Sequence, residues 1–72
     1  MDYTKRMRDY REDHDLKQET VALALSITQQ QYQLYESGKR KIPIDKFMLL
    51  CEFYNVSADY LLGFTDIEKP LK

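Results

Sequence analysis

The chain has 72 residues, a formal net charge of −1, and 43% hydrophobic residues. A chain of this length forms one domain with a modest core, which leaves little room for a deep catalytic cleft. No apolar run approaches the roughly 20 residues that span a bilayer. The first residues lack the apolar stretch of a secretory signal, so we expect a cytoplasmic protein.

Helical spacing of apolar residues predicts two helices in the first third of the chain. Tyr3, Met7 and Tyr10 recur at i, i+4 and i+7, which predicts a helix from about Tyr3 to His14. Leu16 is expected to be a buried anchor in the connection that follows. A second helix is expected from Lys17 to Leu25, with an inner face made of Val21, Ala22 and Leu25.

A tight turn at Ser26 and Ile27 is expected to lead into a third helix. Thr28 is a good N-cap for a helix from Gln29 to about Ser37, and Gly38 is well placed to stop it. The tyrosines of this helix sit three residues apart and are expected to face the core. The amide side chains are left on or near the outer surface.

Pro43 fits the entry to a fourth helix over Ile44–Tyr54, which Asn55 can end in a left-handed cap. Its buried stripe is predicted to consist of Ile44, Phe47, Leu50, Cys51 and Tyr54. Ser57 is expected to cap a short fifth helix over Ala58–Leu62, which Gly63 stops. The sequence therefore predicts an all-α domain over residues 1–63 and a C-terminal tail over residues 64–72.

Charge is distributed unevenly, which matters more for binding than the net value. The segment Thr20–Gly38 holds a single charged residue, Glu36, and directly after it come Lys39, Arg40 and Lys41, with Lys46 past Asp45. Acidic residues collect elsewhere, at Asp9, Glu12, Asp13, Asp15, Asp59, Asp66 and Glu68. A neutral face beside a basic cluster can bind a polyanion locally.

Two short helices joined by a tight turn, with amides on the second, are typical of a DNA-reading helix-turn-helix. In such a unit the first turn of the helix after the tight turn points into the major groove. Here that helix is the third, and its first turn holds Gln29 and Gln30. A glutamine amide presents a donor and an acceptor that match the N6 and N7 edge of adenine. Gln18 could donate to a phosphate, and Lys39–Lys41 could meet phosphates beyond the helix. Alone, the run of glutamines is equally consistent with a solvated helix face, and Lys39–Lys41 fit an ordinary solvated loop better.

A joint pattern links these features to a known family. It lies in the stretches Arg6–Arg11, Leu16–Glu19, Thr28–Gln30, Tyr35–Arg40, Ile42–Pro43 and Asn55–Gly63. On these stretches the chain resembles the Cro/C1-type helix-turn-helix family, also called the XRE family. The resemblance implies a compact five-helix, lambda repressor-like domain that binds operator DNA, usually as a symmetric dimer.

Carried over to this sequence, the resemblance implies roles for individual residues. It implies that Gln18 contacts a phosphate and that the groove-facing residues are Thr28, Gln29, Gln30 and Leu34, with Gln31 and Gln33 more peripheral. It also implies that Arg11 and Glu36 form a structural ion pair, which suits a lone acid that needs a partner. Ser26 stands where the family often has glycine, so we expect some strain in that turn.

These observations favour a transcriptional regulator, a repressor that acts by occupying double-stranded DNA without a cofactor or an evident small-molecule ligand. A homodimer would use the fifth helix and its apolar neighbours, Leu61, Leu62, Phe64, Ile67 and Leu71, although packing on their own core is an equal alternative. The alternative function is a protein-interaction module with weak or no DNA binding, which the acidic balance and Leu34 favour.

An enzyme is not expected. One cysteine, Cys51, and one histidine, His14, are too few for a closed zinc site. The chain has no Ser/His/Asp set and no phosphate-binding glycine loop. Cys51 lies between Leu50 and Phe53 and is expected to be a small buried apolar residue.

Overall fold

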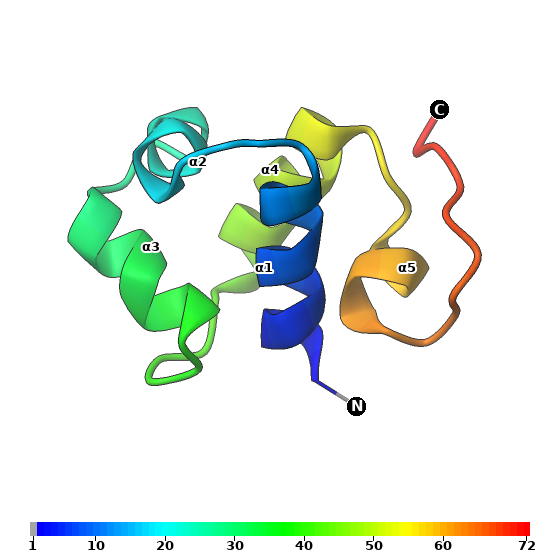
Figure 1. The fold of residues 1–72 in the computed structure, drawn as a ribbon, viewed down its shortest axis with the longest axis horizontal. Helices are drawn as coiled ribbons and strands as arrows, with labels where there is room; N and C mark the ends of the chain where they lie inside the picture. The colour runs from blue at the N-terminus through cyan, green and yellow to red at the C-terminus, as the bar shows by residue number, and fades with distance from the viewer. Residues whose placement is uncertain (1) are drawn as a thin grey trace.

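A computed structural model describes residues 2–72, and helices are the only regular secondary structure in that range, with no strand. The helices are α1 (Tyr3–Asp13), α2 (Gln18–Ala24), α3 (Gln29–Glu36), α4 (Ile44–Tyr54) and α5 (Ala58–Leu62) (Figure 1). The predicted all-α class and the five predicted helices are confirmed, and each helix end lies within one residue of its expected position. No helix in residues 2–72 has the length and apolar character needed to cross a membrane.

Helix α1 lies centrally and separates two sides of the molecule. Helices α2 and α3 lie on one side of α1, and α5 with the C-terminal segment lies on the other (Figure 1). Helix α3 packs on α1 and α2, whereas α5 packs on α1 and α4. The two helices of the predicted DNA-reading unit are therefore adjacent, and α5 does not cover them.

Each helix contributes to one hydrophobic core, which burial of apolar surface stabilises. The buried apolar residues are Met7, Tyr10, Val21, Ala22, Leu25, Tyr32, Tyr35, Phe47, Leu50, Cys51, Val56 and Leu61. Leu16 is half-buried against this core. Burial raises the pKa of the Cys51 thiol, which fits its expected role as a small apolar side chain.

Two apolar residues show how the core compares with the sequence expectation. Ile44 was expected in the buried stripe of α4, but its side chain is 73% exposed. It lies four residues before the exposed Met48, and both side chains line the same apolar groove on the flank of α4. For Leu61 the sequence left two alternatives open, contact with a dimer partner or packing on its own core, and the second holds: Leu61 is fully buried because α5 packs on α1 and α4 with Leu61 inward.

Left-handed residues end three of the helices, as the sequence predicts. Gly38 follows the end of α3 with φ of +81°, and Gly63 ends α5 with φ of +85°, a region where a side chain is unfavourable. Asn55 ends α4 with φ of 52°. Ser57 caps α5, because its hydroxyl accepts a hydrogen bond from the Tyr60 N–H at 3.3 Å.

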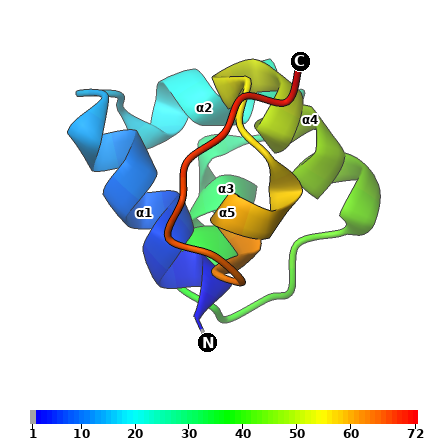
Figure 2. The same ribbon diagram turned by 90° about the vertical axis from the view of Figure 1, so that its right-hand side faces the viewer.

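The C-terminal segment, residues 64–72, folds back along the helices. Figure 2 shows it passing in front of α5 toward the end of α4. The Arg6 guanidinium binds the Asp66 carboxylate at 2.9 Å, and the Tyr10 hydroxyl donates to the Glu68 carboxylate at 2.9 Å. The segment therefore contacts α1 on the side away from α3.

Candidate nucleic-acid interface

A tight turn joins α2 to α3 and sets the angle between them. The Ile27 N–H donates to the Ala22 carbonyl at 3.0 Å, and the Ser26 N–H donates to the Leu23 carbonyl at 3.1 Å, which together close the end of α2. Ser26 has φ of 58°, a left-handed conformation that favours glycine. The expected strain at Ser26 therefore has a backbone basis.

Thr28 fixes the first turn of α3 through a reciprocal pair of hydrogen bonds. Its hydroxyl accepts from the Gln31 N–H at 3.1 Å, and the Gln31 side-chain oxygen accepts from the Thr28 N–H at 3.2 Å. This capping box satisfies two N–H groups that the helix itself leaves free. The Gln31 side-chain oxygen is thus used within the helix start.

The outer face of α3 is polar and carries no charge. Gln29, Gln30 and Gln33 are exposed, whereas the tyrosines of α3 are buried. Leu34 is half-buried, so only part of its side chain lies on the predicted groove-facing surface of α3. The one charged residue of the helix, Glu36, is 5% exposed and points inward.

Glu36 is held by side chains from α1 and from the start of α2. Arg11 Nε lies 2.9 Å from Glu36 Oε2 and Arg11 Nη2 lies 2.9 Å from Oε1, while Arg11 Nη1 donates to the Leu16 carbonyl at 2.8 Å. Burial alone would raise the pKa of Glu36, but the hydrogen bonds to its carboxylate, of which that from Arg11 has the largest effect, outweigh burial and lower that pKa below its usual value. The network fixes α3 against α1 and α2.

Gln18, the expected phosphate contact, is half-buried at the start of α2. Its side-chain nitrogen donates to Glu36 Oε1 at 3.1 Å. An amide nitrogen carries two hydrogens, so one of them remains beyond the bond to Glu36. The structure therefore places Gln18 within the Glu36 network, and its contact with a phosphate stays a prediction.

Three exposed cations follow α3 directly. Lys39, Arg40 and Lys41 are exposed, and none of them forms an ion pair with another residue in the range 2–72. The Arg40 N–H donates to the Leu34 carbonyl at 3.1 Å, which turns the loop back onto the end of α3. This basic loop, residues 39–41, lies on the same side of α1 as α3 (Figure 1).

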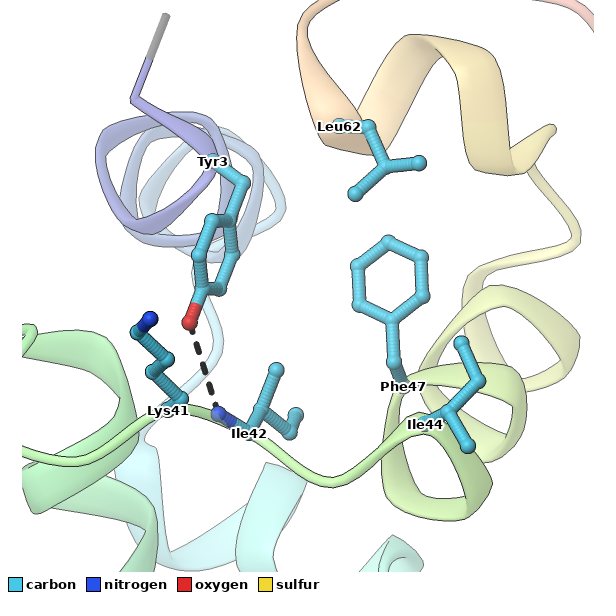
Figure 3. Close-up of a pocket in the computed structure, with 6 residues that line it drawn as sticks. All are labelled: Tyr3, Lys41, Ile42, Ile44, Phe47 and Leu62. Carbon is cyan, nitrogen blue, oxygen red and sulfur yellow. Dashed lines mark hydrogen bonds between the residues drawn. The ribbon is translucent and has the colours of Figure 1, made fainter.

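The other end of the basic loop is anchored on α1 beside a small pocket. Figure 3 shows the Tyr3 hydroxyl directed at the backbone of Ile42, whose N–H donates to it at 3.4 Å. The pocket has a volume of about 230 Å³ and is lined by Tyr3, Lys41, Ile42, Ile44, Phe47 and Leu62. This lining holds no acid–base pair for catalysis, and no metal-binding cluster occurs in the described part of the chain.

Two contacts near the interface were not predicted from the sequence. The Tyr3 hydroxyl anchors the loop, and Lys46, counted there with the basic cluster, donates from α4 to the Leu25 carbonyl at 3.1 Å. Both contacts join residues far apart in the chain. A charge pattern read along the sequence carries no signal for either.

Comparison with known proteins gives a consistent result. A family described as Helix-turn-helix has a model that matches residues 7–61. The chain is 40% identical over 68 residues to the uncharacterized HTH-type transcriptional regulator YobD of Bacillus subtilis (strain 168), covering 94% of this chain and 61% of YobD. It is 33% identical to the HTH-type transcriptional regulator ImmR of the same strain, covering 96% of this chain and 54% of ImmR.

A third relative comes from another organism. The cryptic phage CTXphi transcriptional repressor RstR of Vibrio cholerae is 31% identical, over 97% of this chain and 65% of RstR. The chain thus spans less than two thirds of the length of these curated relatives. No solved structure matches the chain at a significant level.

Proposed function

Because this chain belongs to the Cro/C1-type family of helix-turn-helix proteins, we propose that it binds specific sequences in double-stranded DNA and represses transcription by occupying them. One observation carries the proposal: the first turn of α3 exposes Gln29 and Gln30 on an uncharged surface, next to the unpaired basic loop. A polyanion can approach such a surface, because the only acid of α3, Glu36, is buried and paired.

In this proposal the side chains exposed on α3 and those of the basic loop have different roles. Gln29 and Gln30 read base edges in the major groove, where an amide pairs with adenine N6 and N7. Leu34 lies one turn further along and contacts a thymine methyl through its exposed part. Thr28 faces the groove with them, and Gln33 is more peripheral. Lys39, Arg40 and Lys41 neutralise phosphates and fix the register without reading sequence.

Residues 1–63 form the DNA-binding domain in this proposal, and residues 64–72 form a tail that packs on the domain. Support for packing comes from the Ser57 N–H, which donates to the Lys69 carbonyl at 2.8 Å. The protein acts as a homodimer in the cytoplasm, with two copies reading a symmetric site. The apolar residues left exposed or half-buried for that contact are Leu62, Phe64, Ile67 and Leu71.

The experiment begins with selection of bound sequences from a random duplex pool. The chain is then titrated with the selected duplex and with an unrelated duplex at two salt concentrations. We expect a preference for the selected duplex of at least roughly a thousandfold and a steep loss of affinity as salt rises, because phosphate contacts release counterions. Failure to enrich any sequence, or binding that ignores salt, would contradict the proposal.

The alternative function is a protein-interaction module with the same fold. The observation that favours it is the apolar groove of about 300 Å³ between α4 and α5, which has Ile44 and Met48 at its exposed edge. None of the residues that line this groove belongs to α3. The selection separates the two functions, since an interaction module enriches no duplex.

A further inference from the structure

We propose that Lys46 of α4 is a positioning residue that fixes the orientation of α3 by holding the C-terminal end of α2. Lys46 touches no base or phosphate in this account. It acts through the backbone of the turn between the two helices. The inference rests on the proposed DNA binding, and it adds a residue outside the helix-turn-helix to the set that determines recognition.

The contact that carries the inference is between an ammonium group and a helix end. Lys46 Nζ donates to the Leu25 carbonyl at 3.1 Å, and the Lys46 side chain is half-buried. Leu25 is the C-cap of α2, and the last turn of α2 contains no basic residue of its own. Lys46 therefore supplies, from another helix, the cation that a helix C-terminus favours.

The carbonyl that Lys46 binds belongs to the peptide that enters the left-handed turn. Ser26, the next residue, has φ of 58° and lacks the freedom of glycine. The hydrogen bonds of the Ser26 and Ile27 N–H groups fix the helix side of this turn. The bond from Lys46 engages the Leu25 carbonyl, and the Ser26 N–H of the same peptide donates to the Leu23 carbonyl, so the peptide plane is held on both sides.

Only Ile27 separates this turn from the N-cap of α3, Thr28. Rotation of the peptide after Leu25 therefore moves the first turn of α3, where Gln29 and Gln30 lie. Bidentate base contacts require defined geometry, whereas phosphate contacts tolerate small displacements. Loss of the Lys46 bond should reduce recognition of the correct sequence more than general attraction to DNA.

The test compares Lys46→Met, Lys46→Arg and the control Lys41→Met, which removes an exposed cation of the basic loop. Affinity is measured for the selected duplex and for an unrelated duplex, each at several salt concentrations. Lys46→Met should weaken binding to the selected duplex roughly tenfold, or about 1.4 kcal/mol. It should leave affinity for the unrelated duplex and the salt slope unchanged, and Lys46→Arg should restore most of the loss.

The control should behave differently. Lys41→Met should weaken binding to both duplexes and lower the salt slope by about 0.9, the value for one phosphate contact. If Lys46→Met shows that same pattern, Lys46 is a phosphate contact and the inference is wrong. If Lys46→Met binds both duplexes like the wild type, the inference is also wrong.

A measurement on the protein without DNA tests directly whether Lys46 holds the turn. Amide hydrogen exchange of Ser26 and Ile27 should become faster in Lys46→Met, while the core amides of α1 keep their protection. Equal loss of protection in all helices would indicate a general stability effect and would overturn the inference. If the wild type selects no duplex, the proposed function fails, and the exchange data alone then decide whether Lys46 holds the turn.

Discussion

Arg11 and Glu36 join α1 to α3 through two parallel hydrogen bonds, each 2.9 Å long, in a site where the side chain of Glu36 is 3% exposed. The planar guanidinium fork matches the carboxylate, which gives the pair a fixed geometry as well as energy. Gln18 adds a third bond to the same carboxylate. The orientation of α3 therefore depends on a buried acid that must stay ionised.

The first prediction concerns the pH dependence of stability. The pKa of Glu36 is lower in the folded protein than in the unfolded chain, where it is about 4.3. The ionised carboxylate therefore contributes fully to the free energy of unfolding above that pH. This contribution is lost as the pH falls through the folded-state pKa. Urea unfolding between pH 7 and pH 3 should show a steeper acid loss for the wild type than for Glu36→Gln.

At pH 7, Glu36→Gln should lower the free energy of unfolding by about 3 kcal/mol, because the half-buried Arg11 guanidinium loses its close ion-pair partner. Glu52→Gln, which changes an exposed acid on α4, is the matched control and should have little effect. If the free energy of unfolding fell in parallel with pH for the wild type and Glu36→Gln, the ionisation of Glu36 would not contribute to the acid loss of stability.

The second prediction concerns the strained turn. Ser26→Gly should raise the free energy of unfolding by about 1 kcal/mol, because glycine adopts the left-handed conformation without a steric penalty. Asn55→Gly, at another left-handed position, should gain less, since asparagine tolerates this region better than serine. Thermal unfolding of both variants provides the measurement. Loss of stability in Ser26→Gly would show that the turn is not strained.

The helices could be predicted from sequence because local chemistry specifies them. Thr28 and Ser57 are N-caps, Gly38 and Gly63 favour the left-handed backbone at helix ends, and Tyr32 lies on the inner side of a helical period. These signals act over a few residues, so they can be recognised before any tertiary contact is known. The same reasoning located the exposed amides of α3.

Contacts between distant segments could not be predicted from the same signals. Ile44 fits the period of α4, but no neighbouring element covers its flank, and so it is exposed. Lys46 resembles a member of the basic cluster, yet its ammonium group caps α2. Both outcomes depend on where helices lie relative to one another, which periodicity along one helix does not specify.

The third prediction concerns the C-terminal segment. A chain that ends at Gly63 should keep its helices but lose roughly 2 to 4 kcal/mol of stability, because it forfeits the hydrogen bonds of Thr65, Asp66, Glu68 and Lys69 with the domain, each worth about 0.5 to 1 kcal/mol. Circular dichroism and urea unfolding test this directly. Arg6→Ala in the full chain should show part of the same loss, since Arg6 binds Asp66 and the Thr65 carbonyl. Unfolding of the shortened chain would mean that residues 64–72 belong to the domain.

The fourth prediction concerns the basic loop. Replacing Lys39, Arg40 and Lys41 together by alanine should lower the salt slope of DNA binding by about 2 to 3, at about 0.9 for each contact. The relative preference among base sequences should hardly change, since phosphate contacts carry no sequence information. The control Lys69→Ala changes an exposed lysine of the C-terminal segment, which lies on the other side of α1 from the basic loop (Figure 1), and should leave the slope unchanged. An unchanged slope in the triple variant would remove the loop from the interface.

The most direct test of the central claim is base discrimination by the first turn of α3. Affinity is measured for the selected duplex and for duplexes that differ from it by one base pair, with the wild type, Gln29→Ala and Gln30→Ala. We expect each variant to lose roughly 1–3 kcal/mol of discrimination at one base pair, and to bind the other substituted duplexes with unchanged ranking. If both variants discriminate every position as the wild type does, Gln29 and Gln30 do not read DNA and the account is contradicted.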